Sequence, residues 1–369
     1  MLNSLPTRRL AWVFPGFGVG GAQMRFCALA NHFGPAVAHS VISLNGDLAC
    51  AEKLLPGLDV QFPQAHHPAG RLVEAVLHAR GTFAATRPDL VITSNWGAIE
   101  WAMGARLAGM PHLHSEDGFG PEEQAGQIAR RVWTRRLALR GSQLVLPSRN
   151  LLRIARDIWR LPERRLHYVP NGIDLARFAK ATPMDLPPGE GPVLGTIAAL
   201  RAEKNIGRLV RAVAEVRARR PVRLVVVGDG PERAGLQLLA RALDLEDGVL
   251  FPGHSQQPER WMASFDAFAL SSDTEQMPLS LLEAMAAGLP CLCTDVGDVR
   301  SMVAEANVPF IVPPQDAPFA DGLAAILLEN GRAIGAANQA KAREVFGQEP
   351  MFLAWAKLLG VRDAAPTGQ

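Results

Sequence analysis

Strand-like and helix-like segments alternate along almost the whole chain. Short apolar runs such as RLAWVF (9–14), DLVITS (89–94) and VRLVVVGDG (222–230) have the composition of buried strands. Helical patterns lie between such runs, for example GAQMRFCALANHF (21–33) and NIGRLVRAVAEVRAR (205–219). This alternation predicts an α/β fold with parallel sheets, because parallel strands need crossover connections between them.

The alternating segments form two series of similar plan. Each series opens with a strand and a glycine turn, and the stretch ATPMDLPPGEGP (181–192) between them is rich in Pro and Gly. The length of 369 residues suits two domains of roughly 150 residues each. We therefore predict two Rossmann-like domains facing a cleft, with ligands beyond the carboxyl ends of the strands.

Composition narrows the class of protein. A net charge of +2 gives no indication of a nucleic-acid binder, and 48% hydrophobic residues are enough for large cores. The four cysteines, at 27, 50, 291 and 293, form no disulfide or metal-binding framework, so we expect buried thiols in a reducing cytoplasm. The first residues do not resemble a signal peptide, and no apolar run reaches the ~18–20 residues of a membrane helix.

The segment SSDTEQMPLSLLEAMAAGLP (271–290) places two carboxylates around a predicted helix start. Glu275 lies in the loop before the helix, and Glu283 lies about one turn inside it. The free backbone N–H groups between them form a phosphate site. This pattern suits a sugar nucleotide, because carboxylates accept hydrogen bonds from hydroxyls. The alternative is a surface Glu beside an unrelated Glu on the helix face.

Two further clusters suit phosphates. Gly16, Gly18 and Gly21 satisfy a G-x-G-x-x-G pattern, which alone is a weak dinucleotide signal and lacks a convincing acid after the second strand. Gly20 and Gly21 more readily let a helix start approach a phosphate from the other domain. Arg201 and Lys204, in ALRAEKN, suit a pyrophosphate; the alternative is a solvated basic loop.

Together these motifs resemble the retaining glycosyltransferase family 4, which has the two-domain GT-B fold. The resemblance covers nearly the whole chain and is most specific in VPNGID (169–174) and the paired glutamates. The matching segments are GVGGAQ (18–23), LPSRNLLRIARDIWRLPERRLHYVPNGID (146–174), ALRAEKN (199–205), VVVGDGPE (225–232) and TEQMPLSLLEAMAAGLP (274–290).

The resemblance implies roles for matching positions. Glu275 would bind hydroxyls of the donor sugar, and Glu283 the ribose. Arg201 and Lys204 would hold the diphosphate. Backbone groups of Met277, Leu279 and Ser280, and of Gly20 and Gly21 from the N-terminal side, would also contact the donor. The nucleotide sugar is then a co-substrate, and we expect no cofactor and no obligatory metal.

One departure from the family concerns the residue near the reacting sugar. Many members carry a His after the strand that corresponds to PHLHS (111–115), whereas this chain reads PHLHSEDGFG. Asp117 aligns with that position, and His114 lies three residues earlier. Asp117 could contact the sugar, and His114 could be a second catalytic candidate or a core histidine. A carboxylate there would also suit an inverting base, but the resemblance favours retention.

The domain prediction that follows has three parts. Residues 1–182 form an acceptor-side domain, residues 183–346 form the nucleotide-sugar-binding domain, and residues 347–369 form a helix and tail that pack back on the first domain.

A basic segment stands out in the first half. IARRVWTRRLALR (128–140) gathers Arg130, Arg131, Arg135, Arg136 and Arg140 around Trp133. A basic helix with an aromatic anchor suits an anionic membrane surface, whereas the alternative is a solvated helix.

The sequence therefore predicts a cytoplasmic hexosyltransferase, peripheral at the inner face of the membrane. Its donor would be a nucleotide sugar, and its acceptor a surface polysaccharide or a lipid-linked glycan, with no nucleic acid involved. Two other readings stay open: a GT-B nucleotide-sugar epimerase, and a catalytically silent sugar-nucleotide-binding or assembly protein.

Overall fold

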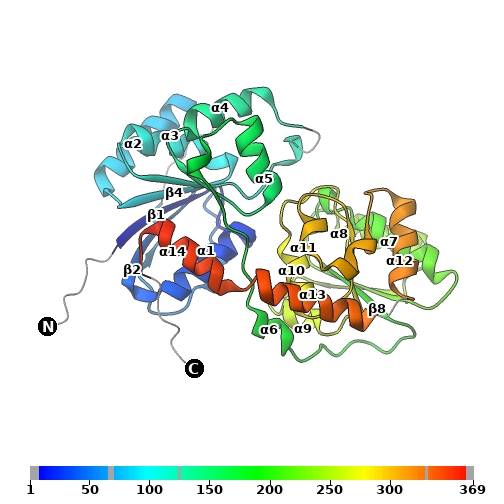
Figure 1. The fold of residues 1–369 in the computed structure, drawn as a ribbon. Helices are drawn as coiled ribbons and strands as arrows, with labels where there is room; N and C mark the ends of the chain where they lie inside the picture. The colour runs from blue at the N-terminus through cyan, green and yellow to red at the C-terminus, as the bar shows by residue number, and fades with distance from the viewer. Residues whose placement is uncertain (1–7, 65–69, 124–125, 329–330, 363–369) are drawn as a thin grey trace. The chain divides into compact units, whose positions relative to one another are not determined.

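The computed structural model describes residues 8–64, 70–123, 126–328 and 331–362. The chain forms two compact units (Figure 1). Unit 1 comprises Met1–Asn171 and Glu349–Gln369, and unit 2 comprises Gly172–Gln348. Residues 172–182, which the sequence analysis placed in the first domain, therefore belong to unit 2. The reason is that Ile173 pairs with the end of unit 2. Its N–H donates to Phe346 O at 2.8 Å, and it forms an isolated parallel β-bridge with Gly347.

Unit 1 is built on a seven-stranded parallel sheet with the order β3-β2-β1-β4-β5-β6-β7. Its strands are β1 (Arg8–Phe14), β2 (Val37–Ser43), β3 (Val60–Gln61), β4 (Leu90–Ser94), β5 (His112–Ser115), β6 (Gln143–Leu146) and β7 (Leu166–Tyr168). Its helices are α1 (Gly21–Phe33), α2 (Leu72–Thr86), α3 (Ile99–Leu107), α4 (Ala129–Leu139), α5 (Arg149–Arg153) and α14 (Gln348–Leu359).

Unit 2 repeats this plan with a six-stranded parallel sheet, ordered β10-β9-β8-β11-β12-β13. Its strands are β8 (Val193–Ile197), β9 (Arg223–Val227), β10 (Val249–Gly253), β11 (Ala267–Leu270), β12 (Cys291–Thr294) and β13 (Ile311–Val312). Its helices are α6 (Leu175–Ala179), α7 (Ile206–Arg217), α8 (Arg233–Ala242), α9 (Pro258–Met262), α10 (Leu279–Ala286), α11 (Val299–Met302), α12 (Asp316–Ile326) and α13 (Gly331–Val345).

Helix α14 completes the core of unit 1. Trp355 on this helix is fully buried, and its ring centroid lies 5.9 Å from that of Trp12 on β1. Phe352 stacks on His32 of α1 with centroids 3.9 Å apart. The C-terminal helix therefore packs on α1 and β1. Residues 363–369 lie outside the described part of the chain.

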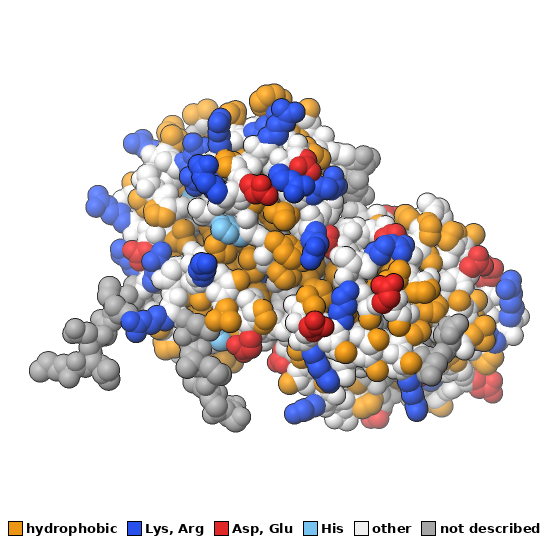
Figure 2. All heavy atoms as spheres, viewed as in Figure 1, with side chains coloured by type: hydrophobic (Ala, Val, Ile, Leu, Met, Phe, Trp, Pro, Cys, Tyr) orange, Lys and Arg blue, Asp and Glu red, His pale blue; other side chains and the backbone are white. Residues whose placement is uncertain are grey.

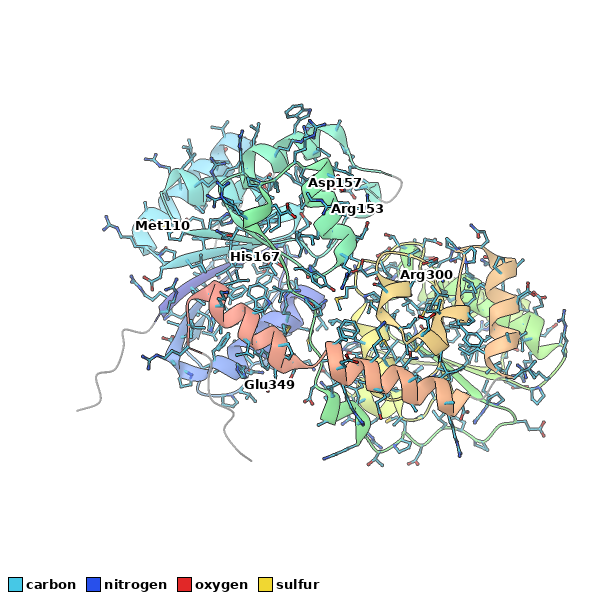
Figure 3. All side chains as sticks on the ribbon, viewed as in Figure 1. Met110, Arg153, Asp157, His167, Arg300 and Glu349 are labelled. Carbon is cyan, nitrogen blue, oxygen red and sulfur yellow. The ribbon has the colours of Figure 1, made fainter. Side chains whose placement is uncertain are left out.

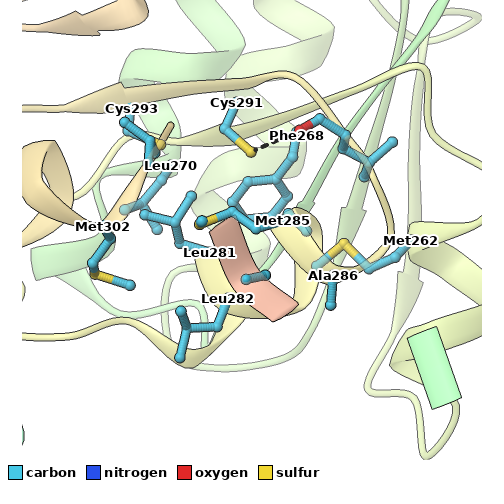
Figure 4. Packing of buried hydrophobic residues seen from close by; sticks show 14 of the residues in the cluster. Met262, Phe268, Leu270, Leu281, Leu282, Met285, Ala286, Cys291, Cys293 and Met302 are labelled. Carbon is cyan, nitrogen blue, oxygen red and sulfur yellow. Dashed lines mark hydrogen bonds between the residues drawn. The ribbon is translucent and has the colours of Figure 1, made fainter. Parts of the chain in front are cut away.

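The core of unit 2 packs α10 against β11 and β12 (Figure 4). Leu281, Leu282 and Met285 of α10 are fully buried with Phe268 of β11. Cys291 and Cys293 are buried free thiols of β12 in the same cluster, as the sequence analysis predicted. This packing fixes the helix whose first turn follows Glu275.

None of the helices within the described ranges combines the length and hydropathy that crossing a bilayer requires.

Candidate functional site

The predicted glutamates lie at the point where the chain of unit 2 changes direction across its sheet. Strand β8 pairs with β9 on one side and with β11 on the other. The loops that follow β8 and β11 therefore leave the sheet side by side at its carboxyl edge. Such a switch point is the usual ligand site of open α/β sheets. One of these loops carries Lys204, and the other carries Glu275.

Lys204 and Glu275 form an ion pair at the switch point. The Nζ atom of Lys204 lies 2.6 Å from Oε1 of Glu275, and the Ser272 hydroxyl donates to the same oxygen at 2.8 Å. The side chain of Lys204 is 25% exposed, and that of Glu275 is 9% exposed. The more exposed member of the pair is therefore the cation. Sequence reasoning had named both ends of this pair but not Ser272.

A third loop supports Glu275 from behind. Gly297 has φ +56°, and a Cβ atom there would come within 2.3 Å of Glu275 O. The N–H of Asp298 donates to Gln276 O at 2.9 Å. Arg300, labelled in Figure 3, lies 2.6 Å from Asp295 and ties this loop to the sheet. Only glycine fits this approach without strain, so Gly297 is a site residue that the sequence analysis missed.

Helix α10 starts directly after the Glu275 loop. Pro278 is its N-cap and, like every proline, offers no N–H; no side chain caps the helix. Met277 is buried in the unit 2 core, which anchors the loop, while Leu279 and Ser280 are the first two helical residues. The uncapped start of α10 leaves backbone donors and the positive end of the helix dipole for a ligand.

Glu283 lies one turn inside α10, as predicted. Its surface is partly exposed, yet desolvation by its surroundings raises the pKa of its carboxyl to about 7. The positive charge of Arg177 lowers this pKa, and the negative charge of Glu259 raises it. Glu283 is therefore poised between the neutral and ionised forms near neutral pH.

Arg201 is not part of the Lys204–Glu275 pair. Its side chain is 64% exposed, and its closest carboxylate contact is Glu203, at 4.0 Å. The backbone nevertheless places Arg201 on the same loop as Lys204, three residues before it. An exposed arginine on this loop can reach a bound diphosphate only by ordering a long side chain.

The glycine loop of unit 1 leads from β1 into α1. Gly20 is the N-cap of α1 and makes no side-chain cap, and Gly21 is the first helical residue. Asp47, the only acid that the dinucleotide alternative offered, accepts from Ala49 N–H at 3.0 Å within its own turn. This local role removes the main support for dinucleotide binding and leaves the open start of α1 as the feature available to a phosphate.

His114 and Asp117 have different environments. His114 is fully buried on β5, and its Nδ1 lies 2.8 Å from the Thr93 hydroxyl. This burial supports the core role that the sequence left open. Asp117 lies just after β5 with its side chain 16% exposed, and both its oxygens accept from Arg25. Arg25, on α1, is a charged residue of this edge that sequence reasoning missed.

The basic segment 128–140 is not one broad cationic surface. Arg135 is fully buried, where its guanidinium donates to Glu123 at 3.0 Å and lies 3.4 Å from Glu116. Its Cζ atom also lies over the rings of Trp96 at 4.8 Å and Trp159 at 5.0 Å. Arg135 is therefore a core residue, which corrects the surface role predicted for it.

The remaining residues of α4 divide between paired and exposed positions. Arg131 pairs with Glu122 at 2.6 Å, and Arg136 donates to Ile158 O at 2.6 Å. Arg130, Trp133, Leu137 and Arg140 are exposed, and the Arg136 guanidinium lies over the Trp133 ring at 4.8 Å. Figure 2 shows Lys or Arg side chains beside hydrophobic ones over this part of unit 1. We call these four exposed residues the α4 outer face.

Within the described ranges, no three His, Cys, Asp or Glu side chains converge in a way that could hold a metal ion.

Two family models match the chain, one on each half. The model of "Glycosyltransferase Family 4" matches residues 19–177, and the model of "Glycosyl transferases group 1" matches residues 183–344. Together these matches contain Gly20, Gly21, Asp117, Lys204 and both glutamates.

Individual relatives match only part of the chain, at 28% identity. A D-inositol 3-phosphate glycosyltransferase of Nocardia farcinica is 28% identical over 276 residues, or 66% of this chain and 60% of that protein. A 2-deoxystreptamine glucosyltransferase of Streptomyces kanamyceticus is 28% identical over 240 residues, or 59% of this chain and 62% of that protein. The matches thus span less than two thirds of either relative.

Solved structures share the fold over nearly the whole length. Sucrose-phosphate synthase from Thermosynechococcus elongatus superposes with a TM-score of 0.75, at 20% identity over 95% of this chain and 98% of the other. Anabaena HepE in complex with UDP and glucose gives a TM-score of 0.77, at 18% identity over 96% and 99%. At this identity, the likeness establishes the GT-B fold.

Proposed function

Since the chain belongs to the family 4 and group 1 glycosyltransferases, we propose that it transfers a hexose from a nucleotide sugar to an acceptor hydroxyl with retention. The Lys204–Glu275 pair carries this proposal. It places the ammonium group of Lys204 2.6 Å from the Glu275 carboxylate, which can accept hydrogen bonds from sugar hydroxyls, next to the uncapped start of α10. A sugar bonded to a diphosphate needs a cation for its phosphates and, beside it, a carboxylate for its sugar hydroxyls.

The two members of the pair would bind different parts of the nucleotide-sugar donor. Lys204 has three N–H donors, so it can keep Glu275 while it also binds a phosphate oxygen. Glu275 would accept hydrogen bonds from sugar hydroxyls, and the N–H groups at the start of α10 would hold the diphosphate. Glu283 would accept from the ribose. Arg201 would close over the phosphates from its exposed loop.

The same groups would stabilise the reaction. As the bond to the sugar breaks, negative charge grows on the leaving diphosphate, where Lys204 and the helix dipole are already oriented. In a retaining reaction the acceptor hydroxyl attacks from the side of the leaving group. The departing phosphate can then take the proton, so the reaction needs neither a protein nucleophile nor a metal. Chelation by EDTA would leave such an activity unchanged.

The donor can be identified by thermal stability. UDP-, GDP- and ADP-sugars would be screened, because a ligand at 100 times its Kd stabilises the folded state by about 2.7 kcal/mol. HepE was solved with UDP and glucose, so UDP-glucose is the first candidate. The matched control is Lys204→Met/Glu275→Gln, which should abolish the shift. If none of these donors shifts the wild-type melting temperature, the proposed function is wrong.

Product analysis separates this function from its rivals. Acceptor-dependent release of the nucleoside diphosphate supports a transferase. Conversion of one nucleotide sugar into its epimer would support an epimerase, and binding without turnover would support a silent assembly protein. NMR of the product gives the anomeric configuration and so tests retention. Surface glycans and lipid-linked oligosaccharides are the acceptor class that we propose.

We also propose that the α4 outer face binds anionic membranes, which would bring the enzyme to a lipid-linked acceptor. Trp133 is 61% exposed and Leu137 is 67% exposed, with Arg130 and Arg140 on the same face. Each Arg near an anionic bilayer contributes about 1 kcal/mol, and salt screens this attraction. Apolar side chains between cations suit the headgroup region.

Vesicle sedimentation tests this surface. Wild type should bind phosphatidylserine vesicles at low salt, and Arg130→Glu/Arg140→Glu should not. The control is Arg219→Glu/Arg241→Glu, which reverses two exposed arginines of unit 2 and makes the same change in net charge. Equal binding by both double variants would exclude the α4 outer face.

A further inference from the structure

Arg208, in the first turn of α7, is bonded to two loops at the carboxyl edge of the unit 2 sheet. In the loop after β11, its Nη1 donates to Ser271 O at 2.8 Å, and its Nη2 donates to Asp273 Oδ1 at 2.8 Å. After β13, its Nη2 donates to Pro314 O at 2.7 Å, and its Nε donates to Asp316 Oδ1 at 3.3 Å. The Arg208 side chain is only 6% exposed. It therefore acts on these loops rather than on a ligand in solution.

The three residues before α7 are each bonded to the loop after β11. The N–H of Asp273 donates to Glu203 O at 2.9 Å, and the Ser271 hydroxyl donates to Lys204 O at 3.1 Å. The side-chain amide of Asn205 donates to the Asp273 carboxylate, with Nδ2 at 3.1 Å from both oxygens. The loop after β8 and the loop after β11 are thus fastened together along three consecutive residues.

Asn205 forms the turn between Lys204 and α7. Its φ of +42° and ψ of +48° lie in the left-handed region, which Asn adopts more readily than most residues. Its Oδ1 accepts from the Arg208 N–H at 3.2 Å and caps α7. Asp273 accepts from both Asn205 and Arg208, so it connects the turn to the guanidinium. This cluster fixes the path of the chain at Lys204, the residue directly before the turn.

We propose that Arg208 is a positioning residue for the diphosphate site of unit 2. Through Ser271 and Asp273 it holds the loop after β11 against Lys204, so that the Lys204 ammonium is already ordered beside Glu275 before a ligand arrives. An ordered lysine binds a phosphate without the entropy cost of fixing its side chain. This inference rests on the proposed glycosyltransferase function and deepens it.

The alternative is that the contacts of Arg208 only stabilise unit 2. Arg211 supplies the matched control, because it lies three residues further along α7 and also contacts Asp316, at 2.7 Å. Arg208→Met and Arg211→Met each remove a cation from this same carboxylate. Arg208→Met also breaks the bonds to the loop after β11, whereas Arg211→Met leaves them in place.

The experiment is a double-mutant cycle in nucleoside diphosphate affinity, measured by calorimetry with whichever of UDP, GDP and ADP wild type binds most tightly. Lys204→Met should weaken binding at least about tenfold, because a charge-assisted hydrogen bond is lost. Arg208→Met alone should weaken binding about fivefold or more, and adding Lys204→Met to it should cost less than about threefold further. Arg211→Met should stay within about twofold of wild type, and adding Lys204→Met to it should again cost about tenfold.

Asp273→Ala tests the same coupling without removing the buried guanidinium. Asp273 is 44% exposed, and Arg208 keeps its contact with Asp316 in this variant, so no buried charge is left uncompensated. Adding Lys204→Met to Asp273→Ala should also cost less than about threefold. This variant decides the question if Arg208→Met does not fold, and melting temperatures show which proteins are folded at the temperature of the measurement.

The contrary outcomes are distinct. If Lys204→Met weakens binding equally in wild type, Arg208→Met and Asp273→Ala, the cluster is only structural, and this inference is wrong while the proposed function stands. The same conclusion follows if Arg211→Met removes the effect of Lys204→Met as fully as Arg208→Met does. If wild type binds none of the three nucleotides, or if Lys204→Met leaves its affinity unchanged, the proposed function itself fails.

Discussion

The two units place a charge pair at the same edge of their sheets, but they expose opposite members of it. In unit 2 the cation is the more exposed partner, since Lys204 is 25% exposed and Glu275 is 9% exposed. In unit 1 the anion is the more exposed, since Asp117 is 16% exposed and Arg25 is 5% exposed. One fold plan thus presents positive charge in one unit, which suits phosphates. In the other unit it presents a carboxylate, which suits hydroxyls.

We expect the largest effect on stability where both members of an ion pair are buried, as in the ion pairs of Arg135. Arg135→Met should lower the free energy of unfolding by about 3–5 kcal/mol, because it removes the buried cation that contacts the buried carboxylates of Glu116 and Glu123 and leaves Glu123 only its longer contact with Arg131, at 3.3 Å. Urea unfolding would measure this. Arg130→Met, on the exposed side of the same helix, should stay within about 0.5 kcal/mol of wild type. Equal losses in both variants would refute the core role of Arg135.

The next effect concerns the anion of the unit 2 pair. Glu275→Gln should lower turnover about 10- to 100-fold, because the amide is a weaker acceptor for sugar hydroxyls than a carboxylate. The melting temperature should change little, since Lys204 stays partly exposed. Transfer rates and thermal melts of the same preparation test this. Glu344→Gln, at an exposed position of α13, is the control; a Glu275→Gln enzyme as active as this control would remove Glu275 from the site.

Lys204, the cation of the same pair, should affect the binding of nucleoside diphosphate. Lys204→Met should weaken nucleoside diphosphate binding by about 1.5–3 kcal/mol, because a charge-assisted hydrogen bond is lost. Arg201→Met should weaken it less, since the exposed Arg201 side chain must be ordered before it can contribute. Calorimetry with UDP, GDP and ADP gives both values. The reverse ranking would make Arg201 the principal phosphate ligand.

The smallest predicted effect is a pH dependence from Glu283. Its pKa of about 7 means that the carboxylate form, which accepts from the ribose hydroxyls, increases as pH rises through 7. Nucleoside diphosphate affinity should therefore rise by up to about tenfold per pH unit below this pKa. The effect on stability has the opposite sign. Because the folded pKa lies above the unfolded value, the neutral carboxyl stabilises unit 2 fully below about pH 4.5, and this contribution is lost as pH rises through 7.

Glu283→Gln supplies the control for this pH series. The phosphate groups of the ligand also titrate near neutral pH, and that contribution should persist in the variant. Subtracting the variant's pH profile leaves the part due to Glu283. A wild-type profile that coincides with that of Glu283→Gln would show that this carboxyl does not contact the nucleotide in its ionised form.

Sequence patterns located the elements with strong contrast between apolar and polar positions. The predicted helix 21–33 matches α1 residue for residue, and the predicted helix 205–219 contains α7. No element was assigned to α3 or α13, whose small residues give little contrast. Gly335 of α13 shows the reason, because a Cβ atom there would lie 1.9 Å from Gly288 O. Helices that pack this closely need Gly and Ala, and these residues blur the amphipathic pattern.

Some residues of the candidate site could likewise be found from the sequence, and others could not. Glu275, Glu283 and Lys204 were found because their meaning is local, set by a strand end or a helix start. Arg25 was missed because its partner Asp117 is 92 residues away in sequence. Arg135 was misplaced because an arginine is normally exposed, and its burial depends on carboxylates and aromatic faces from other segments. Within the candidate site, ion pairs between segments distant in sequence are what the sequence did not reveal.

The return of the chain to unit 1 through α14 has a consequence for biosynthesis. Unit 2 is continuous in sequence, so everything that it needs has left the ribosome once residue 348 emerges. Unit 1 begins to be synthesised first, yet Trp12 has no Trp355 beside it until α14 appears more than 330 residues later. The first unit to be made is thus the last to be completed, and until then an apolar patch around Trp12 is open to a chaperone.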